Sequence, residues 1–168
     1  MWNDIEEPLA YLITFRTYGT WLPGDDRGSI DRFHNLVGGP RAVSSAARQR
    51  INSERLKSPP FKLNAKARSA VESAILEVCL YKQWPLSALS IRTNHAHAVV
   101  YGTEGSARIL NNLKAYATRR LRERGLWGYE HSPWVDKGSR RNLWTEDHLA
   151  TAVNYVFNGQ GDELPEFD

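Results

Sequence analysis

Two histidines separated by a single residue are the feature of this sequence most suggestive of chemistry. His95 and His97 lie in the segment RTNHAHAVV, at the start of an apolar run, in a chain that has five histidines. Side chains of a β-strand alternate between faces, so both imidazoles are expected on one face, with Asn94, Ala96 and Ala98 opposite. Two imidazoles on one face can share a metal ion. The alternative is a pair of structural histidines satisfied by hydrogen bonds.

A tyrosine near the C-terminus, in the segment AVNYVFNGQGDELP, is the second candidate. On a helical wheel, Tyr155 falls at the edge of the apolar face that contains Leu149, so its ring can pack against a core while its hydroxyl faces a cleft. The alternative is a boundary tyrosine with a hydrated hydroxyl. Asn158 and Gln160 add amide oxygens, which suit a hard cation such as Mg²⁺ or Mn²⁺.

Strands and helices are predicted to alternate around these residues. The predicted strands cover 10–22, 86–93, 95–102 and parts of 132–144, and the predicted helices cover 44–57, 65–83, 107–125 and 146–158. Asn64 and Thr145 stand where the caps of two of these helices belong. This order predicts an α+β fold, with a ferredoxin-like antiparallel sheet and helices packed on one face.

The length and charge distribution of the chain narrow the choice of function. A chain of 168 residues fits one domain, so we expect a single domain over 1–168 with a basic insertion at about 24–63. The segment from Arg32 to Arg68 contains nine Lys or Arg residues and one acidic residue, and the segment from Glu104 to Trp144 contains nine and four. Such regions attract phosphate backbones. The alternative is that these charges solvate surface helices.

The cysteine content and the N-terminal segment bear on location. A single cysteine, Cys79, excludes an internal disulfide and a cysteine zinc cluster. The segment MWNDIEEPLAYLITF is acidic before it becomes apolar, unlike a signal peptide, and no stretch has the length needed to cross a bilayer. We therefore expect a cytoplasmic protein that does not associate with membranes.

Several segments together resemble a known superfamily. HAH inside a strand, LKAYATRRLRERG on the next helix, GSRRNLW, and YVFNGQG on a last helix resemble the single-tyrosine transposases of the HUH-endonuclease superfamily, which includes the REP-associated tyrosine transposases. The opening AYLITFRTYGTWLPGDDRG is similar to the first strand and loop of one branch, so the resemblance covers nearly the whole chain. It implies a ferredoxin-like fold, usually dimeric, that recognises hairpins in single-stranded DNA and cuts and rejoins that DNA.

The resemblance also implies roles for individual residues. His95 and His97 match the histidine pair that binds the divalent metal, and Tyr155 matches the nucleophile. In many members a Gln or Asn four residues after the tyrosine completes the metal site. Here that position is Gly159, so Gln160, or alternatively Asn158, is expected to serve.

Bound Mg²⁺ or Mn²⁺ is expected to neutralise the scissile phosphate so that Tyr155 can attack it and form a 5′-phosphotyrosine. Two other functions stay open: a metal-dependent phosphoesterase that uses water, and a domesticated hairpin-binding protein without catalysis. Tyr116 is the rival nucleophile, although its spacing from Leu113 indicates a packed residue.

Single-stranded DNA also needs cations for its phosphates and aromatic rings for its bases. The cations predicted to contact DNA are Lys114, Arg119, Arg120, Arg124, Arg140 and Arg141. The aromatic residues that could stack on bases are Trp21, Trp127, Trp134 and Trp144. For each tryptophan, packing in the core or in an interface is the alternative. The remaining histidines, His34, His131 and His148, have no partner at metal-binding spacing and are expected at the surface.

Overall fold

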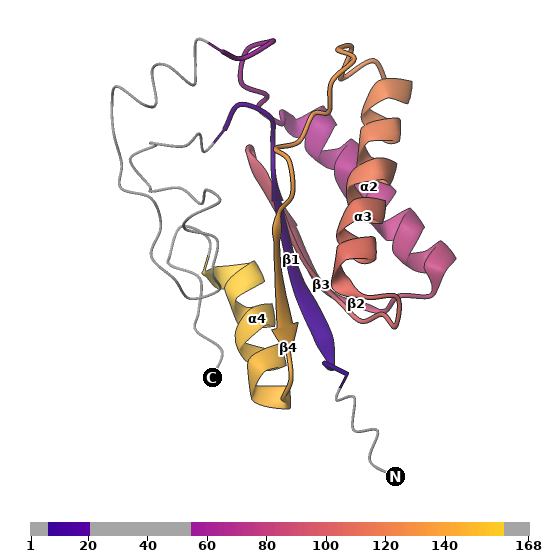
Figure 1. Cartoon of the computed structure of the whole chain (residues 1–168), viewed down its shortest axis with the longest axis vertical. Coiled ribbons are helices and arrows are strands. Elements are labelled where there is room, and N and C mark those ends of the chain that lie inside the picture. The colour runs from indigo at the N-terminus through magenta and orange to yellow at the C-terminus, as the bar shows by residue number, and fades with distance from the viewer. Residues whose placement is uncertain (1–6, 21–54, 160–168) are drawn as a thin grey trace.

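The computed structural model describes residues 7–20 and 55–159, which form one sheet and three helices (Figure 1). In chain order the elements are β1 (Ala10–Arg16), α2 (Ala65–Lys82), β2 (Leu86–Ile91), β3 (His95–Val100), α3 (Ser106–Glu123), β4 (Ser139–Leu143) and α4 (Glu146–Asn158). The strand order is β2-β3-β1-β4, and every neighbouring pair is antiparallel. The predicted α+β class and ferredoxin-like sheet are thereby confirmed.

Side-chain caps begin two of the helices where the sequence predicts them. The Asn64 side chain accepts a hydrogen bond from the Ala67 N–H at 2.9 Å at the start of α2. The Thr145 hydroxyl accepts one from the His148 N–H at 3.1 Å at the start of α4. Each cap satisfies a backbone donor that the first helical turn leaves unpaired, which fixes where the helix begins.

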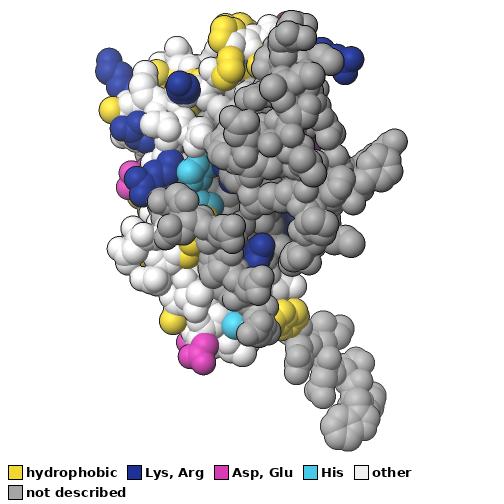
Figure 2. All heavy atoms as spheres, turned by 90° about the vertical axis from the view of Figure 1, so that its left-hand side faces the viewer, with side chains coloured by type: hydrophobic (Ala, Val, Ile, Leu, Met, Phe, Trp, Pro, Cys, Tyr) yellow, Lys and Arg dark blue, Asp and Glu magenta, His cyan; other side chains and the backbone are white. Residues whose placement is uncertain are grey.

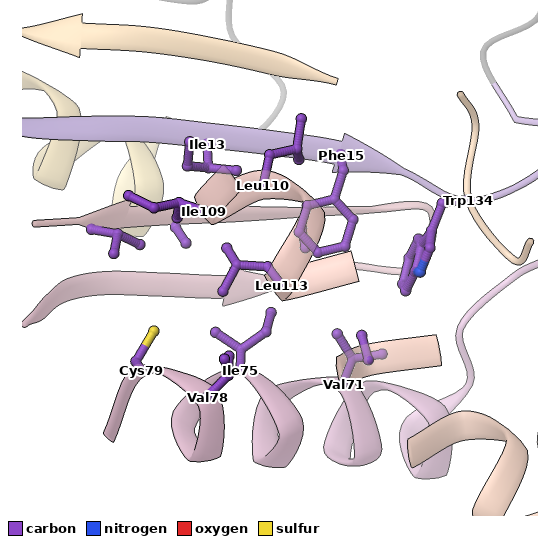
Figure 3. Packing of buried hydrophobic residues seen from close by; sticks show 14 of the residues in the cluster. Ile13, Phe15, Val71, Ile75, Val78, Cys79, Ile109, Leu110, Leu113 and Trp134 are labelled. Atoms are coloured by element: carbon purple, nitrogen blue, oxygen red, sulfur yellow. The ribbon is translucent and has the colours of Figure 1, made fainter. Parts of the chain in front are cut away.

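One face of the sheet packs against α2 and α3 (Figure 3). Ile13 and Phe15 of β1 point to this face, where they meet the inward rows of both helices. Those rows include Val71, Ile75, Val78, Ile109, Leu110 and Leu113, all of them buried. The Trp134 ring stands edge-on to Phe15 with centroids 4.8 Å apart. This layer is the main hydrophobic core.

The helix α4 lies on the opposite face of the sheet, which corrects the expectation that the helices share one face (Figure 1). Ala152 and Val156 of α4 are fully buried against Leu12 of β1 and Val99 of β3. These strand side chains are apolar on the second face as well, so they also require a cover. No helix in the described residues is long and apolar enough to cross a membrane.

The first strand is shorter than predicted, because β1 ends at Arg16 rather than running to residue 22. The chain then turns at Gly19, whose φ of +75° favours glycine. A Cβ at this position would also lie only 2.9 Å from the Pro60 Cα, so there is no room for a side chain. Beyond this turn, the Phe61 N–H donates to the Tyr18 carbonyl at 2.8 Å, so residues 55–63 pack beside the end of β1.

Parts of several predictions lie outside the described residues. They are most of the basic insertion at 24–63, nearly all of the helix at 44–57, and the side chains of Trp21, His34 and Gln160. The predicted single domain over 1–168 stays a prediction for the same reason.

Candidate functional site

The two histidines lie on the central strand β3, on the face that α4 covers. In the ladder between β3 and β1, His95 is paired with Arg16 and His97 is paired with Thr14. Directly paired residues share a face, and the same ladder pairs Leu12 with Val99, both packed under α4. The predicted placement of both imidazoles on one face is therefore confirmed. Their ring centroids are 4.7 Å apart.

Hydrogen bonds hold both rings at Nδ1. The Thr14 hydroxyl oxygen is 2.7 Å from Nδ1 of His97, and the Asn94 amide oxygen is 2.7 Å from Nδ1 of His95. Asn94 belongs to the turn before β3 rather than to the strand, so it orients His95 instead of pointing to the other face. A partner at Nδ1 fixes the ring and makes Nε2 the nitrogen suited to a metal ion.

His97 is held in its neutral form. Its side chain is buried, and burial lowers its pKa to about 3, with further lowering by the charges of His95, Arg16 and Arg92. A metal ligand must be unprotonated, so His97 is ready to bind a metal at neutral pH without first losing a proton. The same low pKa suits a neutral structural histidine.

The tyrosine on the last helix reaches the histidine pair. Tyr155 is buried on α4, one turn from Ala152, and its ring centroid is 5.2 Å from that of His97 at an interplanar angle of 73°. Residues almost sixty positions apart in the sequence thus meet on one face. By contrast, Tyr116 packs on α3 with the core on the other side of the sheet. Only the first of the two predicted nucleophile candidates lies beside the histidines.

The residue one turn after the tyrosine, where many members of the resembling family have a Gln or Asn, is a glycine that leaves room for the Tyr155 ring. Gly159 ends α4, and a Cβ placed there would lie 2.8 Å from the Tyr155 ring. Any side chain at this position would press on the ring, so glycine allows Tyr155 to lie where it does. The Asn158 side chain is exposed and donates to Asn154 at 3.0 Å, while Gln160 lies outside the described residues.

The donor set can be compared with what a metal ion needs. In the part of the chain that the structure describes, no three His, Cys, Asp or Glu side chains gather to hold a metal. Two oriented imidazoles fit a divalent ion that accepts nitrogen ligands, provided that oxygen donors come from an amide, water or phosphate. His95 and His97 therefore fit as a partial site.

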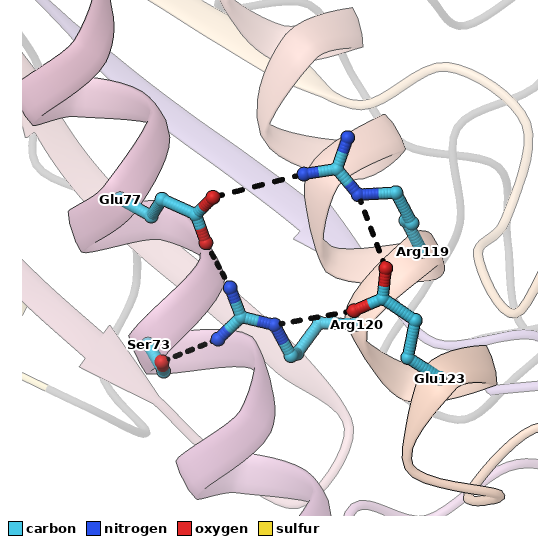
Figure 4. Close-up of polar contacts among 5 residues, drawn as sticks. All are labelled: Ser73, Glu77, Arg119, Arg120 and Glu123. Atoms are coloured by element: carbon cyan, nitrogen blue, oxygen red, sulfur yellow. Dashed lines mark hydrogen bonds and ion pairs between the residues drawn. The ribbon is translucent and has the colours of Figure 1, made fainter.

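Three of the predicted DNA-binding cations are engaged within the protein. Arg120 of α3 donates to Ser73 of α2 at 2.5 Å and pairs with Glu77 (Figure 4). Arg119 pairs with Glu77 of α2 and with Glu123 of its own helix. The Lys114 ammonium donates to the backbone carbonyls of Val135, at 2.8 Å, and of Lys137, and burial lowers its pKa. These contacts cross-link the helices and the loop before β4.

The other three cations lie on different surfaces. Arg124 lines an open pocket of about 500 Å³ between the start of α2 and the end of α3. Arg140 is paired with Ile13 and reaches Ser106 at 3.3 Å, so it belongs to the α2 and α3 face. Arg141 is paired with Leu12 and belongs to the α4 face. Of the six cations, Arg141 is the one that shares the face of the histidines.

The tryptophans and remaining histidines are mostly structural. Trp127 and Trp134 are almost fully buried, whereas Trp144 is 44% exposed. His131 packs against Trp127 with centroids 5.3 Å apart, and His148 lies at the start of α4, where its Nδ1 accepts a hydrogen bond from the backbone N–H of Trp144 at 3.3 Å. Packing, the alternative reading, therefore holds for two of the four tryptophans.

Sequence reasoning missed the residues that surround the histidines. Thr14, Arg16 and Arg92 were not assigned a role by any motif. The alternation of polar and apolar residues over Thr14, Phe15 and Arg16 could have placed Thr14 and Arg16 on one face of β1. Only the strand register shows that this face meets the histidines.

Comparisons with known proteins point to a fold. No protein-family model and no curated protein matches the sequence. Among solved structures, a REP-associated tyrosine transposase bound to a REP hairpin is similar, with a TM-score of 0.53 and 10% sequence identity over 95% of this chain and 71% of that chain. The chain thus has an α+β fold similar to that of this transposase. At this identity the likeness concerns the fold alone.

Proposed function

We propose that this protein is a metal-dependent endonuclease and strand transferase that acts on hairpin-containing single-stranded DNA. The observation that carries the proposal is the 5.2 Å separation between the rings of His97 and Tyr155 on one face of the sheet. The solved transposase of the same fold is bound to a REP hairpin, which supports DNA as the substrate. Figure 2 shows this face, with histidine side chains at the surface beside Lys and Arg side chains.

The proposed reaction uses the tyrosine as a nucleophile. The Tyr155 hydroxyl loses its proton and attacks the phosphorus atom, a P–O bond to tyrosine forms, and the bond to the 3′ oxygen breaks. The 3′ oxygen takes up a proton and leaves as a hydroxyl. The DNA stays joined to Tyr155 through its 5′ phosphate, so a second 3′-hydroxyl can reverse the step on another strand. Cutting and joining then need no external energy source.

The histidines would position the phosphate. His95 and His97, fixed by Asn94 and Thr14, would hold Mg²⁺ or Mn²⁺, with Gln160 or Asn158 proposed as the third protein ligand. When bound, the ion would supply positive charge that offsets the negative charge of the phosphate oxygens. Dimer formation, which the resemblance implies, and a cytoplasmic location, which the sequence predicts, are part of the proposal.

Replacement of the tyrosine tests the proposal most directly. With Mn²⁺ and a single-stranded hairpin oligonucleotide, the wild-type protein should form an adduct that survives denaturing electrophoresis. Tyr155→Phe should lower adduct formation by about a thousandfold or more, because the ring stays but the nucleophile is removed. Tyr116→Phe is the matched control, since it removes the same atom from the other side of the sheet.

Three results would contradict the proposal. An adduct of undiminished yield in Tyr155→Phe would reject this nucleophile. Cleavage without any adduct in the wild-type protein would favour a phosphoesterase that uses water. Binding of the hairpin without cleavage, unchanged when His95 and His97 are both replaced by alanine, would favour a hairpin-binding protein without catalysis.

A further inference from the structure

Two arginines that the proposed mechanism does not use flank the histidine pair. Arg16 is the direct partner of His95 in the ladder between β1 and β3, so its side chain leaves the sheet on the same face. Arg92 lies in the hairpin turn before β3, where its N–H donates to the His95 carbonyl at 2.8 Å. Arg92 is exposed, and Arg16 is partly exposed. Both are therefore held at the edge of the site by backbone pairing.

The described charged groups nearest the histidines are positive. Among the described residues, the charged groups that act on His97 are His95, Arg16 and Arg92, all of which are cationic when charged. This part of the chain also has no group of three metal-binding side chains, and therefore no cluster of carboxylates beside the pair. A divalent cation that approaches such a site alone is repelled by the guanidinium groups. A phosphodiester would remove that repulsion and add oxygen ligands.

The arginines on the other face are used differently. Arg119 and Arg120 share Glu77 and Glu123 as counter-charges, so acids of α2 and α3 neutralise these two cations. Arg16 and Arg92 come from a strand end and a turn, within range of the site. An arginine presents several N–H donors in a plane, a geometry that matches phosphate oxygens.

We propose that Arg16 and Arg92 contact nucleic-acid phosphates beside His95 and His97, so that DNA and a divalent metal ion bind this site with positive cooperativity. This inference rests on the proposed function, since it assumes that the histidine pair binds a metal. It adds a binding order: the phosphate completes a site that holds the ion weakly by itself. By linkage, the ion strengthens DNA binding by the same factor.

Binding of Mn²⁺ followed by electron paramagnetic resonance tests the inference without catalysis. All proteins carry Tyr155→Phe so that no adduct forms, and free Mn²⁺ is measured at constant ionic strength with and without a single-stranded hairpin oligonucleotide. We expect the hairpin to tighten Mn²⁺ binding by about tenfold or more, within the usual range for coupled sites. Arg16→Gln and Arg92→Gln should each reduce this gain several-fold, and Mn²⁺ alone should bind these variants slightly more tightly.

Arg108→Gln is the matched control, because it makes the same change in net charge on α3, on the other side of the sheet, where Arg108 pairs with Glu104. This variant should keep the full gain, and circular dichroism should show that all variants are folded. Equal Mn²⁺ affinity with and without DNA would overturn the inference, as would an equal gain in all three variants.

The two proposals fail separately. If Mn²⁺ binding depends on His95 and His97, and the protein with Tyr155 intact forms its adduct, but DNA leaves Mn²⁺ affinity unchanged, the inference alone is wrong. If Mn²⁺ binding is the same after both histidines are replaced by alanine, and no adduct forms, both proposals are overturned.

Discussion

The two faces of the sheet carry different kinds of side chain although the same strands build both. The strand β3 contributes Ala96 and Ala98 to the face under α2 and α3, and His95 and His97 to the face under α4. On β1 and β3 the first face is apolar, whereas the second face is apolar at Leu12 and Val99 and polar at Thr14 and the two histidines. Because side chains alternate along a strand, one segment can belong to the core and to a site at once.

The cations follow the same division. On the helices α2 and α3, Arg119 and Arg120 are tied to acids. On the other face, Arg16 and Arg141 come from strands and point to the side where the histidines lie. The comparison therefore separates positive charge that links helices from positive charge that lies on the histidine face.

The largest effect should come from the core under α2 and α3. Leu113 is fully buried on α3, so Leu113→Ala should lower the free energy of unfolding by about 4 kcal/mol, through lost burial and the cavity that remains. Urea denaturation measures this loss. DNA affinity of the folded protein should be unchanged, and a weaker affinity at full folding would mean that this face also takes part in binding.

A smaller effect should come from His97 and should depend on pH. Its pKa is lowered to about 3 in the folded protein, while the unfolded imidazole titrates near its ordinary value, so the unfolded state takes up a proton first as the pH falls. The contribution of His97 to stability is therefore fully present above the ordinary pKa of histidine and is lost as the pH falls from that value to about 3. Between pH 7 and pH 4 this amounts to roughly 2–3 kcal/mol.

His97→Asn removes the titrating group and keeps a polar side chain next to Thr14. Urea denaturation of both proteins at several pH values should therefore show a shallower acid-side loss of stability in the variant. Equal slopes in the two proteins would mean that His97 is not held neutral by its surroundings.

The smallest effect should separate two adjacent arginines. Arg141 lies on the face of the histidines and Arg140 on the other face. Arg141→Gln should weaken binding of a single-stranded hairpin by about threefold to tenfold at moderate salt, as for the loss of one phosphate contact, and Arg140→Gln by less than about twofold. Fluorescence anisotropy measures both. Equal losses would show that DNA does not distinguish the two faces.

Much of the fold could be predicted because its signals are local. The caps at Asn64 and Thr145 were predicted from residue type and position, and the structure confirms both. The end of β1 at Arg16 was missed, since Thr17 to Trp21 are as rich in β-forming residues as the strand itself. Backbone pairing with β3 and β4, rather than propensity, decides where that strand stops.

The candidate site was predictable only in part, because the roles of its cations depend on partners far away in the sequence. Lys114 was expected to contact phosphate, but its ammonium is bonded to the loop before β4. Arg119 and Arg120 were expected to do the same, but they meet Glu77 of another helix. A positive charge in a sequence does not reveal which acid or carbonyl the fold brings to it.

The sequence by itself determined that His95 and His97 share a face, because the alternation of side chains along a strand is a property of the backbone. It also determined where α4 begins, because a cap acts within one helical turn. The tertiary structure alone decided that α4 lies on the histidine face and that the ring centroids of Tyr155 and His97 are 5.2 Å apart. It also decided which face of the sheet each of Arg140 and Arg141 occupies. Strand register and helix docking depend on contacts between distant segments, and no short stretch of sequence contains that information.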